Sequence, residues 1–188
     1  MPLDQPHFFG YGSLVNRATH DYPRPRPASL LGWRRVWVHV ASRPVAFLSV
    51  ERATGSQILG LVAQVPGADW AALDAREYAY LRQPETTLVD DKPVPVQVYA
   101  VPADDHLPPT TANPLILSYI DAVVQGFLRE FGPQGAAHFF ATTHGWQAPV
   151  LNDRANPSYP RHQVLTAAER RVVDEGLAQA GARIMPSG

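Results

Sequence analysis

The sequence predicts an α+β protein in which strands occupy the first half of the chain and helices the second. Between residues 7 and 100, β-branched and aromatic residues form alternating or continuous apolar runs, as strands do. After residue 113, apolar residues recur at helical spacing. Because 45% of the 188 residues are hydrophobic and 18% are charged, we expect a folded chain with a sizeable core. We expect one domain, 1–188, with a β-rich core (7–112) and a helical C-terminal extension packed on it (113–188).

The first half contains six expected strands and one expected helix. The strand ranges are 7–11, 30–40, 45–50, 58–65, 81–89 and 94–100. Prolines 23, 25 and 27 indicate a loop, and Pro95 indicates an edge position or a bulge. Pro66-Gly67 should end the fourth strand, and Asp69 can then cap a helix that begins at Trp70.

The second half is expected to be helical. Asn113-Pro114 is typical of a helix start, and apolar residues from Ile116 to Phe131 follow with helical spacing. Gly132-Pro133 should stop this helix, with a short second helix over 135–143. After an irregular, proline-punctuated stretch (147–161), the capping box Thr166 to Glu169 predicts a last helix to about Ala180.

Composition excludes several classes of function. The chain has no cysteine, which excludes disulfides, thiol nucleophiles and cysteine-bound metals. Its net charge of −1 gives no general reason to expect nucleic acid or an anionic membrane as partner. No apolar run approaches the ~20 residues of a membrane span, and no secretory signal opens the chain. Together these observations lead us to expect a cytoplasmic protein. The seven histidines lack metal-ligand spacing, so we expect no metal site.

Glu77 is the first candidate functional residue. On a helix that begins near Trp70, it shares a face with Trp70, Leu73, Tyr80 and Leu81. Burial among apolar neighbours should raise the pKa of its carboxyl from about 4.3 toward the ~6–7 that suits acid/base catalysis at neutral pH. The alternative is a buried ion pair with Arg82 or with an arginine from a strand.

The turn after the first strand, Gly10 to Leu14, is the second candidate. Its glycines permit a sharp turn and the close approach of a ligand. The exposed N–H groups of such a turn can bind a carboxylate or a carbonyl oxygen. Val15 stands where a dinucleotide fingerprint needs its third glycine, and Ser13 lacks the flanking glycines of a nucleophile elbow. The alternative is an ordinary tight turn.

The polar segment 152–161 is the third candidate, because a stiff polar loop can cover a pocket. The alternative is a surface loop in which Asp153 is tied to a neighbouring arginine.

Taken in order, four strings resemble the γ-glutamylcyclotransferase-like superfamily, which includes ChaC-type and AIG2-like proteins. These are Tyr11-Gly12-Ser13-Leu14, Gly32-Trp33-Arg34-Arg35 with Trp37, Gly60-Leu61-Val62-Ala63, and Leu73-Asp74-x-Arg76-Glu77. The resemblance covers roughly residues 7–100. It implies a small, mixed, partly closed β-barrel with flanking helices.

The resemblance also implies a site and a reaction. The backbone of Tyr11, Gly12, Ser13 and Leu14 would hold a glutamyl head, and Glu77 would be the catalytic acid/base. The α-amine of a small γ-glutamyl substrate would attack its own γ-carbonyl, which gives 5-oxoproline and a released amine without a cofactor. Tyr80, close to Glu77, would contact the substrate or pack beside it.

Two features leave the function open. ChaC-type proteins carry Gly-Gly-Tyr after the glutamate, whereas this chain has Tyr78-Ala79-Tyr80, so the resemblance does not extend to glutathione specificity. The alternative to an enzyme is a non-catalytic protein that binds a small ligand on the same fold. A buried acid favours the enzyme, because a binding protein does not need one. The leaving amine and the oligomeric state do not follow from the sequence.

Overall fold

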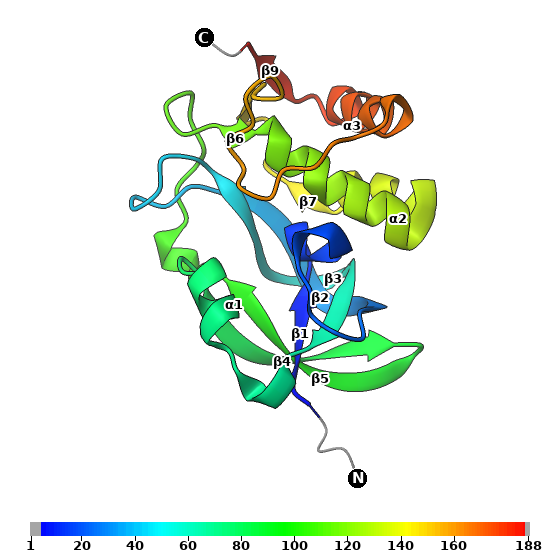
Figure 1. The fold of residues 1–188 in the computed structure, drawn as a ribbon. Helices are drawn as coiled ribbons and strands as arrows, with labels where there is room; N and C mark the ends of the chain where they lie inside the picture. The colour runs from blue at the N-terminus through cyan, green and yellow to red at the C-terminus, as the bar shows by residue number, and fades with distance from the viewer. Residues whose placement is uncertain (1–4, 187–188) are drawn as a thin grey trace.

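A computed structural model describes residues 5–186, in which five strands close into a mixed β-barrel (Figure 1). The strands are β1 (His7–Gly10), β2 (Arg26–Val38), β3 (Phe47–Gln64), β4 (Leu81–Val89) and β5 (Lys92–Ala100). Their order is β3-β1-β5-β4-β2, and β2 pairs back onto β3. β1 and β5 are parallel, and the other junctions of the barrel are antiparallel. The predicted α+β class and mixed barrel are confirmed.

The barrel is closed by two narrow junctions. β1 meets β5 only where Phe8 pairs with Gln97, and β2 meets β4 only where Ser29 pairs with Leu88. Pro95 therefore lies outside the part of β5 that has a strand on both sides, which explains how a proline is tolerated there.

The expected strands 45–50 and 58–65 are one continuous strand, β3. The strand continues through residues 51–57 across a shift of its register with β2: Glu51, Arg52 and Gln57 have partners on β2, and residues 53–56 lie at the shift between Leu31 and Trp33. Gly32, with φ +78°, lies at this shift. β2 begins at Arg26, so Pro27 belongs to the strand and not to the expected loop.

Several short elements surround the barrel. They are the 3-10 turns η1 (Ser13–Val15), η2 (Arg17–Thr19), η3 (Pro66–Ala68) and η4 (Ala103–Asp105), the helix α1 (Ala71–Arg76), and β7 (Thr143–His144), which pairs with β2. α1 begins one residue later than expected, and Asp69 accepts a hydrogen bond from the N–H of Ala71 at 3.2 Å.

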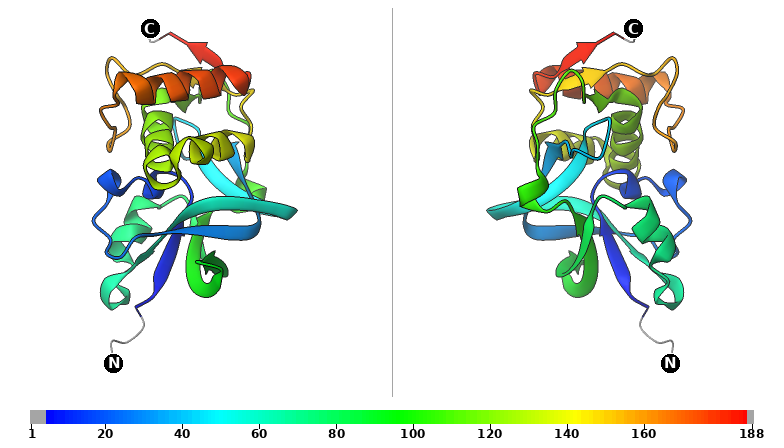
Figure 2. Two further views of the ribbon diagram at one scale, coloured as in Figure 1. Left: turned by 90° about the vertical axis from the view of Figure 1, so that its right-hand side faces the viewer. Right: turned by 90° about the vertical axis from the view of Figure 1, so that its left-hand side faces the viewer.

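A helical layer lies above the barrel, with α1 beside the barrel (Figures 1 and 2). It consists of α2 (Leu117–Ala141), α3 (Ala167–Gln179) and a small parallel sheet of β6 (Leu115–Ile116), β8 (Pro149–Leu151) and β9 (Arg183–Met185). The predicted capping box of Thr166 and Glu169 opens α3. The largest apolar cluster contains barrel residues such as Leu48 and helical residues such as Phe127, so the two layers share a core.

The structure corrects the expected start of α2, which begins at Leu117 and not at Asn113-Pro114, because residues 115–116 form β6. The predicted stop is confirmed, since Gly132 has the non-helical angles φ +70° and ψ −167° and separates two helical arms, the second of which ends at Ala141. No helix within residues 5–186 is long and apolar enough to span a membrane.

Asp153 ties the segment after β8 to the start of α2. Its buried carboxylate accepts hydrogen bonds from the N–H (2.8 Å) and hydroxyl (2.5 Å) of Ser118, and from the N–H of Ser158 (2.8 Å). The expected Asp153–arginine tie is therefore wrong, since the nearby Arg154 instead contacts Asp121 at 2.7 Å. Burial acts to raise the pKa of Asp153, but hydrogen bonds from Ser118 and Ser158 bring it below its ordinary value.

Asp153→Ala is expected to lower the free energy of unfolding by about 1–3 kcal/mol, because α2 loses a cap and the Ser118 donors lose their acceptor. Urea unfolding measures the change, with the exposed Asp104→Ala as a matched control. An Asp153→Ala midpoint equal to that of the control would contradict the capping role.

Candidate active site

The two glycines of the turn that follows β1 are in close contact with neighbouring side chains. A Cβ on Gly12 would lie 2.6 Å from the Tyr119 hydroxyl oxygen and 3.2 Å from the Leu48 side chain. A Cβ on Gly10 would lie 2.5 Å from the Leu14 Cβ. A Cβ at either position would force these neighbours to shift, so glycine allows them to pack directly on the backbone of the turn.

Arg35 fixes this turn from the interior of the protein. Its side chain is fully buried and donates from Nε to the Tyr11 carbonyl at 2.7 Å, and also to the Leu59 carbonyl and to Thr142 Oγ1. The guanidinium carbon lies 4.7 Å from the centre of the Phe127 ring on α2. Burial lowers the pKa of Arg35 to about 9, which leaves it charged at neutral pH. Arg35 belongs to a string that carried the family resemblance, but sequence reasoning gave it no role.

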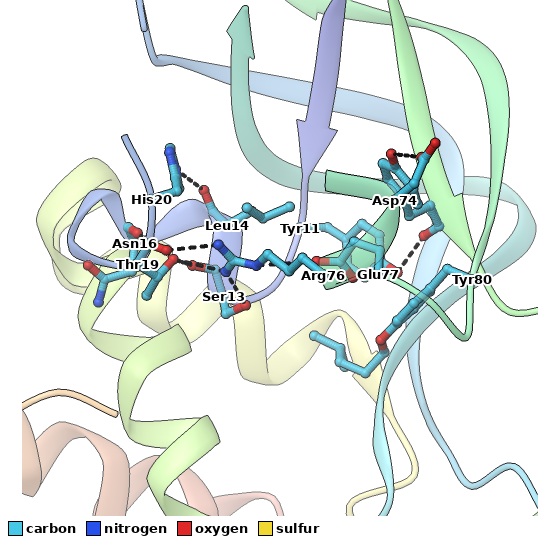
Figure 3. Close-up of polar contacts among 12 residues, drawn as sticks. Tyr11, Ser13, Leu14, Asn16, Thr19, His20, Asp74, Arg76, Glu77 and Tyr80 are labelled. Carbon is cyan, nitrogen blue, oxygen red and sulfur yellow. Dashed lines mark hydrogen bonds and ion pairs between the residues drawn. The ribbon is translucent and has the colours of Figure 1, made fainter. Parts of the chain in front are cut away.

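Arg76, the last residue of α1, connects that helix to the turn (Figure 3). Its Nη1 donates to the Thr19 carbonyl at 2.8 Å, and its Nη2 donates to the Ser13 and Thr19 hydroxyls at 3.1 Å each. Its Nε lies 3.5 Å from Glu77 Oε1. Arg76 thus donates its hydrogen bonds to neutral oxygens of Ser13 and Thr19, which holds the end of α1 against the turn. Its contact with the neighbouring Glu77 is a longer ion pair.

Glu77 lies just past the end of α1, not on the helix face that the sequence predicted. It has φ −100° and ψ 35°, and its N–H donates the last bond of the helix to Leu73. Leu81, expected on the same buried face, is 64% exposed at the start of β4. The alternative partner Arg82 contacts Asp74 instead, at 3.6 Å.

The environment of Glu77 favours a retained proton. Its side chain is only 15% exposed. Burial raises the pKa of the carboxyl above its ordinary value, and the positive charges of Arg76, Arg43 and Arg161 oppose that rise. A carboxyl whose pKa is raised by burial and that lines a cavity is a candidate for proton transfer.

One cavity brings together Glu77, Tyr80 and the turn after β1, whereas the third candidate, the segment 152–161, does not line it. It has an empty volume of about 310 Å³, open solvent at its mouth included. It is lined by Phe9, Gly10, Tyr11, Gly12, Ser13, Leu14, Leu48, Glu77, Tyr80, Tyr99 and Tyr119. Sequence reasoning missed Leu48, Tyr99 and Tyr119, because they come from β3, β5 and α2 and no local pattern connects them to the turn.

The tyrosines form a fixed wall. The Tyr11 hydroxyl donates to the Tyr99 carbonyl at 2.6 Å, the Tyr80 hydroxyl to the Leu48 carbonyl at 2.5 Å, and the Tyr99 hydroxyl to Asp74 at 2.5 Å. Burial raises the pKa of all three phenols, which keeps them neutral at physiological pH. A ligand would therefore meet a rigid aromatic surface with one titratable acid, Glu77.

Within residues 5–186, no group of three or more histidine, aspartate or glutamate side chains is arranged to hold a metal ion.

Comparison with known proteins identifies the family. The sequence model described as "Gamma-glutamyl cyclotransferase, AIG2-like" matches residues 8–117, more than half of the chain. The chain belongs to the γ-glutamyl cyclotransferase, AIG2-like family. The matched range contains β1 through β5, the turn, Arg35, Arg76 and Glu77.

Solved structures share the family fold at low sequence identity. A structure titled "Gamma-glutamyl cyclotransferase" has a TM-score of 0.60 and 13% identity, with 92% of this chain and 99% of that chain covered. The structure of an uncharacterized human protein, loc79017, has a TM-score of 0.59 and 13% identity, with 92% of this chain and 99% of that chain covered. The structure of YkqA from Bacillus subtilis has a TM-score of 0.59 and 15% identity, with 71% of this chain and 52% of that chain covered. A search of curated protein sequences finds no match.

Titration of the Glu77 carboxyl by ¹³C NMR is expected to give a midpoint above the ~4.3 of exposed glutamates, because burial disfavours the charged form. Glu77→Gln identifies the resonance by its absence. A Glu77 midpoint at or below the ~4.3 of an exposed glutamate would contradict the described electrostatics.

Proposed function

We propose that the protein cyclises γ-glutamyl compounds, releasing 5-oxoproline and an amine, with Glu77 as the acid/base. The observation that carries the proposal is the shared cavity of Glu77 and the turn 11–14. Family membership supports the reaction class, and the site geometry supports the residue roles.

We assign substrate binding to Tyr11, Gly12, Ser13, Leu14 and Tyr80. Gly12 lines the cavity, and its lack of a side chain allows the oxygens of a glutamyl head to approach its backbone. The aromatic wall that includes Tyr80 limits the space and favours a folded-back substrate. Such a conformation brings the α-amine to its own γ-carbonyl, which removes much of the entropic barrier to ring closure.

The chemistry needs one proton carrier. The α-amine nitrogen attacks the γ-carbonyl carbon and loses a proton to the Glu77 carboxylate. The carbon–nitrogen bond to the leaving amine then breaks, and Glu77 returns that proton to the leaving nitrogen. Atoms balance without water or a cofactor, because the nucleophile belongs to the substrate. A carboxyl with a raised pKa suits both halves of this transfer.

The second candidate is a non-catalytic ligand-binding protein, which the 3.5 Å contact between Arg76 and Glu77 would favour if it held the carboxylate permanently. In that case Glu77 would influence ligand affinity but no 5-oxoproline would form from any γ-glutamyl compound.

Glu77→Gln is expected to fold normally and to lose turnover by about 10²-fold or more, because the amide cannot carry the proton. Release of 5-oxoproline from a panel of γ-glutamyl amino acids, peptides and amines measures this. Glu175→Gln, at an exposed position of α3, serves as the control. Full activity of Glu77→Gln would contradict the role of Glu77, and a panel without any product would favour the binding protein.

The pH dependence of kcat/KM should show an acid limb set by Glu77. The carboxylate is the base, so activity falls as the pH drops through the pKa of Glu77, which burial places above that of an ordinary glutamate. A rate profile between pH 4 and pH 9 measures the limb. A limb at or below the ~4.3 of a free glutamate would be inconsistent with this assignment.

A further inference from the structure

Arg35 is a fully buried charge that no acid balances. Its side chain is 0% exposed, and none of the ion pairs within residues 5–186 includes it. Its three hydrogen-bond acceptors, the carbonyls of Tyr11 and Leu59 and the hydroxyl of Thr142, are all neutral. Burial of a cation without a counter-ion destabilises a fold, so the positive charge of Arg35 needs an explanation.

The packing of Arg35 does not explain its charge. The guanidinium carbon lies 4.7 Å from the centre of the Phe127 ring and 5.4 Å from that of Phe139. An apolar side chain of similar length would pack against the same rings, and well-packed apolar residues often replace buried ionic groups without loss of stability. Neutral donors could also satisfy neutral oxygens, so the feature that is specific to arginine here is the charge itself.

This charge lies directly behind the turn. Arg35 Nε donates to the Tyr11 carbonyl at 2.7 Å, and that carbonyl shares a peptide unit with the Gly12 N–H. The described chain has no cis peptide bond, so this N–H points away from Arg35. Gly12 lines the cavity, and no backbone carbonyl among residues 5–186 accepts a hydrogen bond from its N–H. Because hydrogen bonds in series polarise one another, the cation makes the Gly12 N–H a stronger donor.

The charges around the cavity agree with this arrangement. Burial lowers the pKa of Arg35, and the charge effects that oppose this shift come from Tyr11 and Tyr119, which both line the cavity. Glu77 is the acid among the lining residues, and its carboxylate would repel an anionic ligand. A buried cation behind the turn offsets that repulsion, because charges interact strongly where water is excluded.

We propose that Arg35, acting through the Tyr11–Gly12 peptide, supplies the positive charge with which the turn binds the carboxylate of the glutamyl head. This inference rests on the proposed function and adds a positioning residue to it. Arg35 does not touch the ligand. It fixes the turn and gives it a positive potential, so that the backbone can bind an anion in a cavity that already contains an acid.

The sharpest test neutralises Arg35 in place. Thr142→Asp puts a carboxylate where Arg35 Nη1 now donates to a hydroxyl at 2.8 Å, and it leaves the bond to Tyr11 intact. Thr142→Asn is the matched neutral variant. The ligands are 5-oxoproline and 5-oxoprolinamide, in which a neutral amide replaces the carboxylate, and calorimetry measures their affinities. Thr142→Asp should bind 5-oxoproline about 10-fold more weakly than Thr142→Asn, with a change of less than about threefold for the amide.

Variants of Arg35 itself complete the test. Arg35→Met removes the charge with a chain of similar length and should lower the affinity for 5-oxoproline by about 10-fold or more, but that for the amide by much less. Arg35→Lys keeps the charge and should retain part of the preference for the carboxylate. Arg154→Gln is the control, because Arg154 is also partly buried but is balanced by Asp121 and Asp174, and the preference should stay unchanged.

The outcomes separate this inference from the function on which it rests. Equal binding of 5-oxoproline by Thr142→Asp and Thr142→Asn would show that the charge of Arg35 has no role, and would overturn the inference even if Arg35→Met does not fold. Equal losses for both ligands in Arg35→Met, or a wild type that does not prefer the carboxylate, would also overturn it alone. A wild type that binds neither ligand would contradict the proposed function as well.

Discussion

The contact of Arg76 with residues 13–19 is the interaction on which the site depends. Its guanidinium uses neutral oxygens of Ser13 and Thr19, so α1 is held against the turn and the next residue, Glu77, reaches the cavity. A buried carboxylate without any positive neighbour would be strongly destabilised, and one in a close ion pair would be a poor base. The 3.5 Å separation of Arg76 Nε and Glu77 Oε1 lies between these extremes.

A second arginine acts in the same way on the other side of the turn. Arg35 donates to the Tyr11 carbonyl and stacks on Phe127, so the turn is linked to both the barrel and α2. Tyr119, also on α2, lies against Gly12. The helical layer therefore contributes directly to the cavity, and Asp153 helps to hold that layer by capping α2.

Sequence reasoning found the parts of the site that local patterns encode. Glycines 10 and 12 after an apolar strand indicated an uncovered turn, and the apolar neighbours of Glu77 indicated a buried acid. The helix face expected around Glu77 is wrong, because α1 ends at Arg76 and the chain turns into β4. A six-residue helix cannot present the five-position stripe that the spacing suggested.

The missed features all depend on contacts between distant parts of the chain. Residues 51–57 belong to a strand because β2 pairs with both ends of this stretch, across a register shift that no local pattern indicates. Tyr119 lies more than 100 residues after the turn that it contacts. The spacing of residues along the sequence carries no signal for such contacts.

The most direct test of a single site built from the turn and Glu77 is an NMR titration of the labelled protein with 5-oxoproline, the proposed product. The account predicts that the backbone amides of residues 11–14 and the Glu77 carboxyl resonance shift together along one saturation curve. Shifts confined to other parts of the barrel, or a turn that responds while Glu77 does not, would contradict it.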